Sequence, residues 1–211
     1  MNRILVLSPH PDDESIGCGG TLRRHVLARD PVKVIFLTSG EKGGHGRPPE
    51  ETRRVRAAEA RAAGRILGLK HLAFWQQPDG AVQASASLVR RLQLEIKEWA
   101  PDRVYVTHDR ELHPDHRAAV RLIRKALRGP GAPRKKPVVL MYEVWTPLQR
   151  MDEIVDISPF VRTKLRAVRA YRTQCEVLSF DEAILGLNRY RGEMHSWPGG
   201  DHAEVFARLR L

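Results

Sequence analysis

The sequence has few cysteines, few aromatic residues and no long hydrophobic run, and these shortages exclude several classes of protein. Cys18 and Cys175 are its only cysteines among 211 residues, too few for a disulfide framework and not spaced as a metal-binding pair. No apolar stretch reaches the ~18 residues of a membrane-spanning helix, and the N-terminal segment lacks a signal-peptide pattern. We therefore expect a soluble, cytoplasmic protein, without a membrane partner, that is stabilised by a hydrophobic core.

The chain has an excess of positive charge, with 36 Lys and Arg against 25 Asp and Glu and a formal net charge of +11. Most basic residues alternate with apolar helix positions, which is typical of solvated helix faces. Only 6% of the residues are aromatic, and the sequence contains no helix-turn-helix, zinc-finger or RNA-recognition signature. We therefore expect no nucleic-acid partner. The charge fits solvated helix faces, and attraction for an anionic small-molecule substrate is a second hypothesis.

Short apolar segments alternate with amphipathic segments along the chain. The pattern predicts strands at 3–8, 32–38, 71–74, 103–107 and 138–145, and helices at 20–30, 50–67, 85–99, 114–127, 160–175 and 181–194. Residues 203–211 fit either a strand or a short helix. The alternation predicts a single α/β domain over residues 1–211, a three-layer Rossmann-like sandwich with a mostly parallel sheet. With the common strand order 3-2-1-4-5, its active site lies at the C-terminal ends of the first and fourth strands.

A cluster of acidic residues follows the first predicted strand. The segment Pro9-His10-Pro11-Asp12-Asp13-Glu14 places one imidazole and three carboxyl groups in a tight turn. Acids at a helix N-terminus contribute ~0.3–1 kcal/mol each, which explains one acid but leaves His10 unexplained. Such crowding of negative charge indicates a bound cation.

A second cluster follows the fourth predicted strand, where His113 and His116 flank Asp115. The predicted topology brings the two clusters together at one crevice. Imidazole and carboxylate are ligands that zinc and similar divalent ions take, and two histidines with one carboxylate leave coordination positions open for water. The sequence therefore predicts a metal site between the ends of these strands.

The two motifs resemble those of the LmbE-like proteins, the N-acetylglucosaminyl-phosphatidylinositol de-N-acetylase (PIG-L) family, which share an early (A/P)HPDDE motif and a later HPDH motif. The resemblance covers nearly the whole chain and implies a zinc-dependent deacetylase acting on an N-acetylglucosamine-containing small molecule. It continues through Gly17-Cys18-Gly19-Gly20-Thr21, Ser39-Gly40-Glu41, Arg56-x-x-Glu59, Leu67-Gly68, Pro78-Asp79-Gly80 and Ala203-Glu204-Val205-Phe206.

The resemblance also implies roles for three residues of the first motif and for one residue of the second. His10, Asp13 and His116 would bind the metal, with zinc as the expected ion and ferrous iron as the alternative, because ligand type does not separate the two. Asp12 would be the general base that deprotonates the zinc-bound water.

Four further residues complete the site that the resemblance implies. His113 would stabilise the oxyanion as an imidazolium, and Asp115 would hold its tautomer and raise its pKa. Arg56 would contact the substrate, although an exposed helix arginine is an equally simple interpretation. Asp79 would be a second substrate contact, although a Pro-Asp-Gly turn already explains an aspartate there.

Two alternative functions fit the same sequence. One is a family amidase that cleaves a sugar-linked conjugate at the same metal site. The other is a basic nucleic-acid-binding module, which salt-dependent retention by nucleic acid would reveal. The family resemblance also predicts a homo-oligomer, which light scattering would test.

Overall fold

The computed structural model describes residues 1–195 and 199–211. Its centre is a seven-stranded sheet in the order β3-β2-β1-β4-β5-β7-β6. Strands β1 to β5 run parallel to one another in the order β3-β2-β1-β4-β5, which confirms the mostly parallel α/β sheet and the predicted order 3-2-1-4-5. Strand β7 pairs antiparallel with both β5 and β6. The strands are β1 (Ile4–Ser8), β2 (Val32–Thr38), β3 (His71–Gln77), β4 (Arg103–Thr107), β5 (Val138–Tyr142), β6 (Glu153–Asp156) and β7 (Ala203–Arg208).

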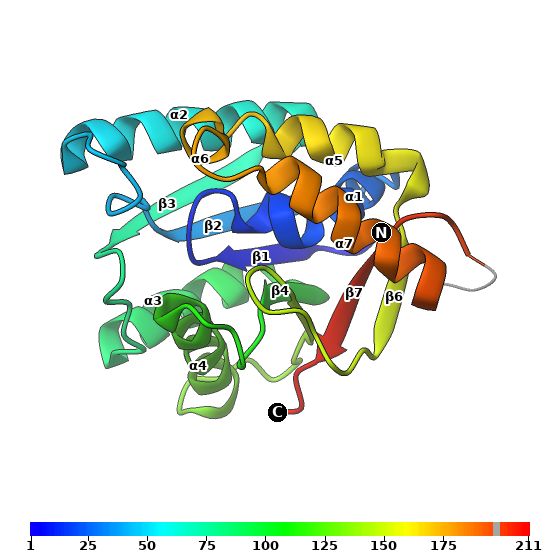
Figure 1. Cartoon of the computed structure of the whole chain (residues 1–211). Coiled ribbons are helices and arrows are strands. Elements are labelled where there is room, and N and C mark those ends of the chain that lie inside the picture. The colour runs from blue at the N-terminus through cyan, green and yellow to red at the C-terminus, as the bar shows by residue number, and fades with distance from the viewer. Residues whose placement is uncertain (196–198) are drawn as a thin grey trace.

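Helices cover both faces of the sheet and make three layers. The helices are α1 (Asp13–Leu27), α2 (Pro49–Leu67), α3 (Ala86–Trp99), α4 (Pro114–Arg128), α5 (Val161–Val168), α6 (Arg172–Cys175) and α7 (Phe180–His195), with a 3-10 turn, η1, at Ser158–Phe160. Figure 1 shows α3 and α4 on one side of the sheet and α1, α2, α5 and α7 on the other. Each side has its own large cluster of buried apolar side chains. Among the described residues, none of the helices combines the length and apolar character needed to span a bilayer.

Helix α1 begins at Asp13, earlier than the predicted start at residue 20. Small residues allow this glycine-rich segment to press against the sheet, because a Cβ on Gly17 would overlap the ring of Tyr142. The backbone leaves helical geometry at Cys18, where φ is −142°. Just beyond this break, the N–H groups of Gly20 and Thr21 donate to the carboxylate of Glu204 on β7. The buried acid therefore satisfies backbone groups near the helix break.

The chain after β5 departs most from the prediction. Strand β5 ends at Tyr142 instead of continuing to residue 145, and the short strand β6 was not predicted. The predicted helix at 160–175 is divided into η1, α5 and α6. Residues 203–208 form a strand, which resolves the open alternative for this segment. Strand β6 lies at the edge of the sheet and is only partly buried, so it lacks the apolar pattern that marks the inner strands.

Candidate metal centre and active site

The turn after β1 and the start of α4 bring three potential metal ligands together. His10 Nδ1, Asp13 Oδ2 and His116 Nε2 each lie 3.2 Å from the other two atoms. Zinc bonds of ~2.0–2.2 Å in a tetrahedral arrangement place neighbouring ligand atoms about 3.4 Å apart. The nitrogen and oxygen donors therefore have the spacing and chemistry that a divalent ion requires, on the residues that the sequence predicted.

The outer ring nitrogens of both histidines face carboxylates. His10 Nε2 lies 3.2 Å from Oδ1 of Asp79 and 3.2 Å from Oδ2 of Asp115. His116 Nδ1 lies 3.6 Å from Oε2 of Glu111. A carboxylate behind a ligand histidine fixes the orientation of its ring and increases its basicity. These contacts leave His10 Nδ1 and His116 Nε2 directed toward the proposed ion.

The charges of the cluster favour a cation at this point. Burial would lower the pKa of His10, but hydrogen bonds with Asp115 and Asp13 raise it well above its usual value. Burial also opposes charge on His116, yet Asp13 and Glu111 raise its pKa to about 9. In return, the two histidines hold the pKa of Asp13 far below its usual range despite burial. The acidic surroundings thus stabilise positive charge among the ligand atoms.

Asp12 lies beside the ligands but points to a different partner. Its φ of 125° is rare for a residue other than glycine, and strain of this kind is typical of functional turns. Its carboxylate accepts a hydrogen bond from Arg56 Nη2 at 2.7 Å. Burial raises the pKa of Asp12 to about 7, although the charge of Arg56 opposes the shift. A carboxylate with such a pKa is suited to accept a proton near neutral pH.

Arg56 is buried on α2, which rules out the interpretation as an exposed helix arginine. Its guanidinium donates to Asp12 and to the backbone oxygens of Pro11 and Gly40. Arg56 also lines the cavity, where its Nε has no hydrogen-bond partner within the described part of the chain. The observed contacts position Asp12, and a direct substrate contact remains a prediction.

The hydrogen bonds of the Asp115 carboxylate go to groups other than His113, so its expected hold on the tautomer of His113 stays a prediction. This carboxylate accepts hydrogen bonds from Gly80 N at 2.7 Å and Val82 N at 3.0 Å, besides lying against His10. His113 Nδ1 instead accepts from the backbone N–H of Asp115 at 3.2 Å, which places the proton of a neutral ring on Nε2. A carboxylate oxygen of Asp115 and a ring nitrogen of His113 nevertheless lie within 4.8 Å of each other.

Burial and the neighbouring rings of His10 and His116 lower the pKa of His113, whereas the charges of Asp115 and Asp13 oppose this shift. The raising effect of Asp115 agrees with the sequence analysis, and the imidazolium form of His113 stays a prediction. The ring lines the cavity and lies edge-on to His10, with 4.5 Å between ring centroids. A neutral His113 can still donate a hydrogen bond from Nε2 to an oxygen in the cavity.

Asp79 occupies a turn that joins two parts of the site. Its Oδ2 accepts from the backbone N–H of Lys42 at 2.9 Å, while its Oδ1 faces His10. Burial would raise the pKa of Asp79, but the hydrogen bond to His10 lowers it to about 2. Gly80, with φ of 72°, completes the turn in a conformation that favours glycine. Asp79 lines the cavity, and its contact with substrate stays a prediction.

Glu111 is a residue of the site to which the sequence analysis gave no role. It is almost completely buried, and its carboxylate accepts from Val144 N at 2.7 Å and Trp145 N at 3.1 Å. Because the same carboxylate lies behind His116, it connects a metal ligand with the segment that follows β5. Its only sequence signal is an acid two residues before His113, which a solvent-exposed loop would show equally well.

The ligand cluster opens into a cavity of about 300 Å³. Among the described lining residues, the three aspartates Asp12, Asp13 and Asp79 balance the basic side chains of His10, Lys42 and Arg56. A larger cavity of about 580 Å³, elsewhere on the surface, is lined by Arg110, Arg124, Arg150, Arg208 and Arg210. Much of the positive charge is therefore placed away from the ligand cluster, so net charge alone does not indicate an anionic substrate.

A mostly parallel sheet, with a His–Asp–His cluster that could hold a metal ion beyond the ends of β1 and β4, defines the chain as an α/β protein with a candidate metal site. The chain belongs to the PIG-L family, described as GlcNAc-PI de-N-acetylase, whose sequence profile matches residues 5–127. It is similar to the probable N-acetyl-alpha-D-glucosaminyl L-malate deacetylase 2 of Bacillus anthracis. The two are 30% identical over 185 residues, which cover 81% of this chain and 80% of the relative.

Solved structures share the fold over the full chain. The conserved protein TT1542 from Thermus thermophilus superposes with a TM-score of 0.85 at 32% identity, covering 100% of this chain and 98% of that one. The 4-carboxy-2-hydroxymuconate hydratase GalB from Pseudomonas putida reaches 0.88 at 21% identity, covering 100% and 97%. At 21% identity, the likeness to GalB concerns the fold alone. The fold does not determine the reaction, which depends on the residues of the site.

Proposed function

We propose that this protein is a zinc-dependent hydrolase that removes the acetyl group from an N-acetylglucosamine-containing small molecule. The observation that carries the proposal is the equal spacing of His10 Nδ1, Asp13 Oδ2 and His116 Nε2, beside a buried Asp12. The family and the deacetylase relative in Bacillus anthracis support the acetamide as the bond that is cleaved.

Each residue of the site has a task in this reaction. When bound by His10, Asp13 and His116, a divalent ion supplies Lewis acidity to the amide carbonyl and to water. Asp12, held by Arg56, accepts a proton from the attacking water. His113 donates a hydrogen bond from Nε2 to the oxygen that becomes negative as the carbonyl carbon turns tetrahedral. As the C–N bond breaks, the proton that Asp12 took from water passes to the nitrogen, which gives acetate and a free amine.

The test is acetate release from N-acetylglucosamine and its glycosides by metal-stripped protein, reconstituted with zinc or, without oxygen, with ferrous iron. We expect activity only after a metal is restored. Asp12→Asn should lower kcat by at least ~100-fold while it still binds one equivalent of metal, because general-base catalysis contributes about 10²–10⁴-fold. Asp109→Asn, which changes an acid that is 44% exposed, is the matched control.

Two results would count against the proposal. Full activity in Asp12→Asn would show that Asp12 is not the general base. Stoichiometric metal binding without acetate release from any N-acetylated sugar would exclude the deacetylase reaction and direct attention to the amidase alternative.

A further inference from the structure

The cavity of the ligand cluster is polar at its floor and apolar along its outer wall. The floor is formed by the buried side chains of His10, Asp12 and Asp13. An acetyl group presents a single methyl group, which requires very little apolar surface. The apolar lining is far larger and consists of Ile16, Val144, Trp145, Val177, Leu178 and Phe180.

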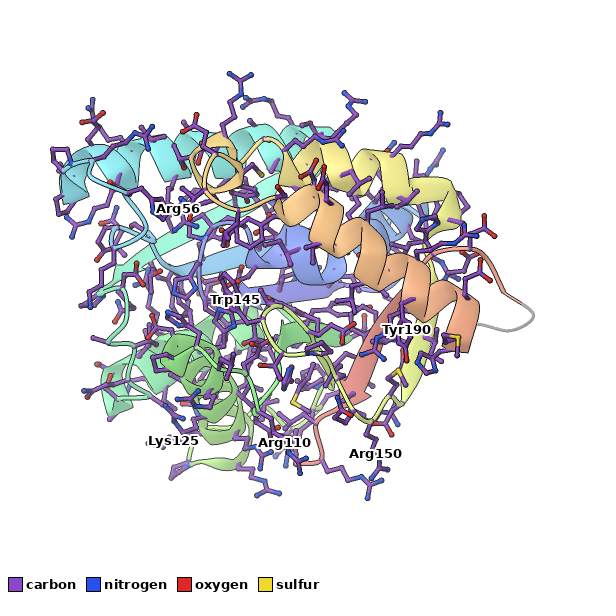
Figure 2. The ribbon with its side chains drawn as sticks, in the orientation of Figure 1. Arg56, Arg110, Lys125, Trp145, Arg150 and Tyr190 are labelled. Atoms are coloured by element: carbon purple, nitrogen blue, oxygen red, sulfur yellow. The ribbon has the colours of Figure 1, made fainter. Side chains whose placement is uncertain are left out.

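Three of these side chains are half exposed at the rim. The exposed fraction is 46% for Trp145, 49% for Val177 and 46% for Leu178. Single exposed apolar residues are common, but a group of them at the rim of a cavity marks a binding surface. Trp145 follows β5, whereas the other two lie between α6 and α7. The fold therefore brings together apolar side chains that are distant in the sequence. In the view of Figure 2, Trp145 lies between α4 and α7.

Hydrogen bonds and ring packing hold this wall in place. The backbone N–H of Trp145 donates to Glu111, and its ring packs edge-to-face on Phe180 with 5.6 Å between centroids. The N–H groups of Val177 and Leu178 both donate to the carbonyl oxygen of Gln174 at 3.1 Å. A wall that is already ordered loses little entropy when a ligand binds.

The charge of the cavity does not favour an anionic group in this place. Lys42 and His45 belong to the loop after β2, whereas the apolar wall is formed by α1, the segment after β5 and the segment that leads into α7. Within the described lining, Arg56 is already paired with Asp12. The apolar wall itself contains no charged side chain, so it fits a group without charge.

We propose that Trp145, Val177, Leu178 and Phe180 form a subsite for an apolar aglycone, so that the preferred substrate is an N-acetylated sugar carrying an aromatic or alkyl group. This inference rests on the proposed deacetylase function. The acetamide reaches the polar floor, and the substituent of the sugar lies against the indole of Trp145. Removing this substituent from water contributes binding energy in proportion to its apolar area.

The experiment compares methyl, phenyl and octyl glycosides of N-acetylglucosamine in both anomeric forms, together with free N-acetylglucosamine and its 1-phosphate. Acetate release by the zinc-loaded protein gives kcat/KM for each. We expect phenyl or octyl glycosides of one anomer to exceed the methyl glycoside by about 10–100-fold, mainly through KM. In Trp145→Ala and Leu178→Ser, this ratio should fall to within about threefold of one.

Tyr190→Ala is the matched control, because this aromatic side chain is 54% exposed on α7 and does not line the cavity. Figure 2 shows Tyr190 well away from Trp145. The control should keep the full preference for apolar glycosides. Equal kcat/KM for methyl and phenyl or octyl glycosides would overturn the aglycone subsite while the deacetylase function stands. A preference for the 1-phosphate would also overturn it, and acetate release from none of the compounds would overturn both proposals.

Discussion

Asp115→Asn tests whether the carboxylate of Asp115 supports the metal ligand His10 or acts on His113. The carboxylate accepts from Gly80 N and Val82 N and lies 3.2 Å from His10 Nε2. An asparagine keeps one acceptor oxygen and turns an NH₂ group toward one of these donors. Because a carboxylate behind a ligand histidine typically contributes 10–100-fold to metal affinity, we expect zinc to bind about 10–100-fold more weakly, a loss of about 1.4–2.7 kcal/mol.

The measurement is a competition titration of zinc against a chromophoric chelator, followed by kcat at saturating zinc. Asp109→Asn is the control, because its carboxylate pairs with Arg124 on the surface and should leave zinc affinity unchanged. Thermal unfolding of the apo-proteins shows whether loss of the contacts with Gly80 and Val82 weakens the fold itself. If Asp115→Asn bound zinc as tightly as the parent and lost only kcat, the carboxylate would act on His113 and our reasoning would be refuted.

Two further variants test the supports of the metal site. Glu111→Gln should weaken zinc binding about tenfold in the same titration, because it removes the charge behind His116; unchanged zinc affinity would contradict this role. On α5, Lys164 Nζ forms a buried ion pair with Oε1 of Glu204 at 2.7 Å. Lys164→Met should lower the free energy of unfolding, measured in urea, by about 3–5 kcal/mol, because the buried carboxylate of Glu204 then has no cationic partner. A loss below about 1 kcal/mol would show that the hydrogen bonds from backbone N–H groups are sufficient for Glu204.

The sequence predicted the inner part of the fold well because hydrophobic burial controls it directly. Strands β1, β2, β4 and β5 are covered on both faces, so each appears as a short apolar run. The outer strand β6 was missed because its side chains alternate between partial burial and exposure. The start of α1 was placed too late, since glycines are poor helix formers and only their packing on Tyr142 and Ile157 explains them.

In the candidate site too, the sequence predicted what depends on strand order and missed what depends on tertiary contacts. The sequence placed His10, Asp13 and His116 at one crevice, because strand order and motif position suffice for that. It did not predict that Asp115 faces His10, because a side chain's direction depends on the local turn and on the neighbouring loop at Gly80. It also could not predict that Arg56 is buried, because Arg53 and Arg54 on the same helix are exposed.

The position of β7 has a consequence for how the molecule is made. This strand comes last in the chain but lies between β5 and β6, so β6 has no neighbouring strand, among the described residues, until β7 arrives. The carboxylate of Glu204 on β7 also accepts hydrogen bonds from two backbone N–H groups of α1, and the first turn of this helix contains Asp13. A chain still emerging from the ribosome therefore presents both motifs of the candidate metal site before the strand that supports α1 exists. We expect nascent chains released before residue 203 to retain zinc poorly, although every ligand is already present.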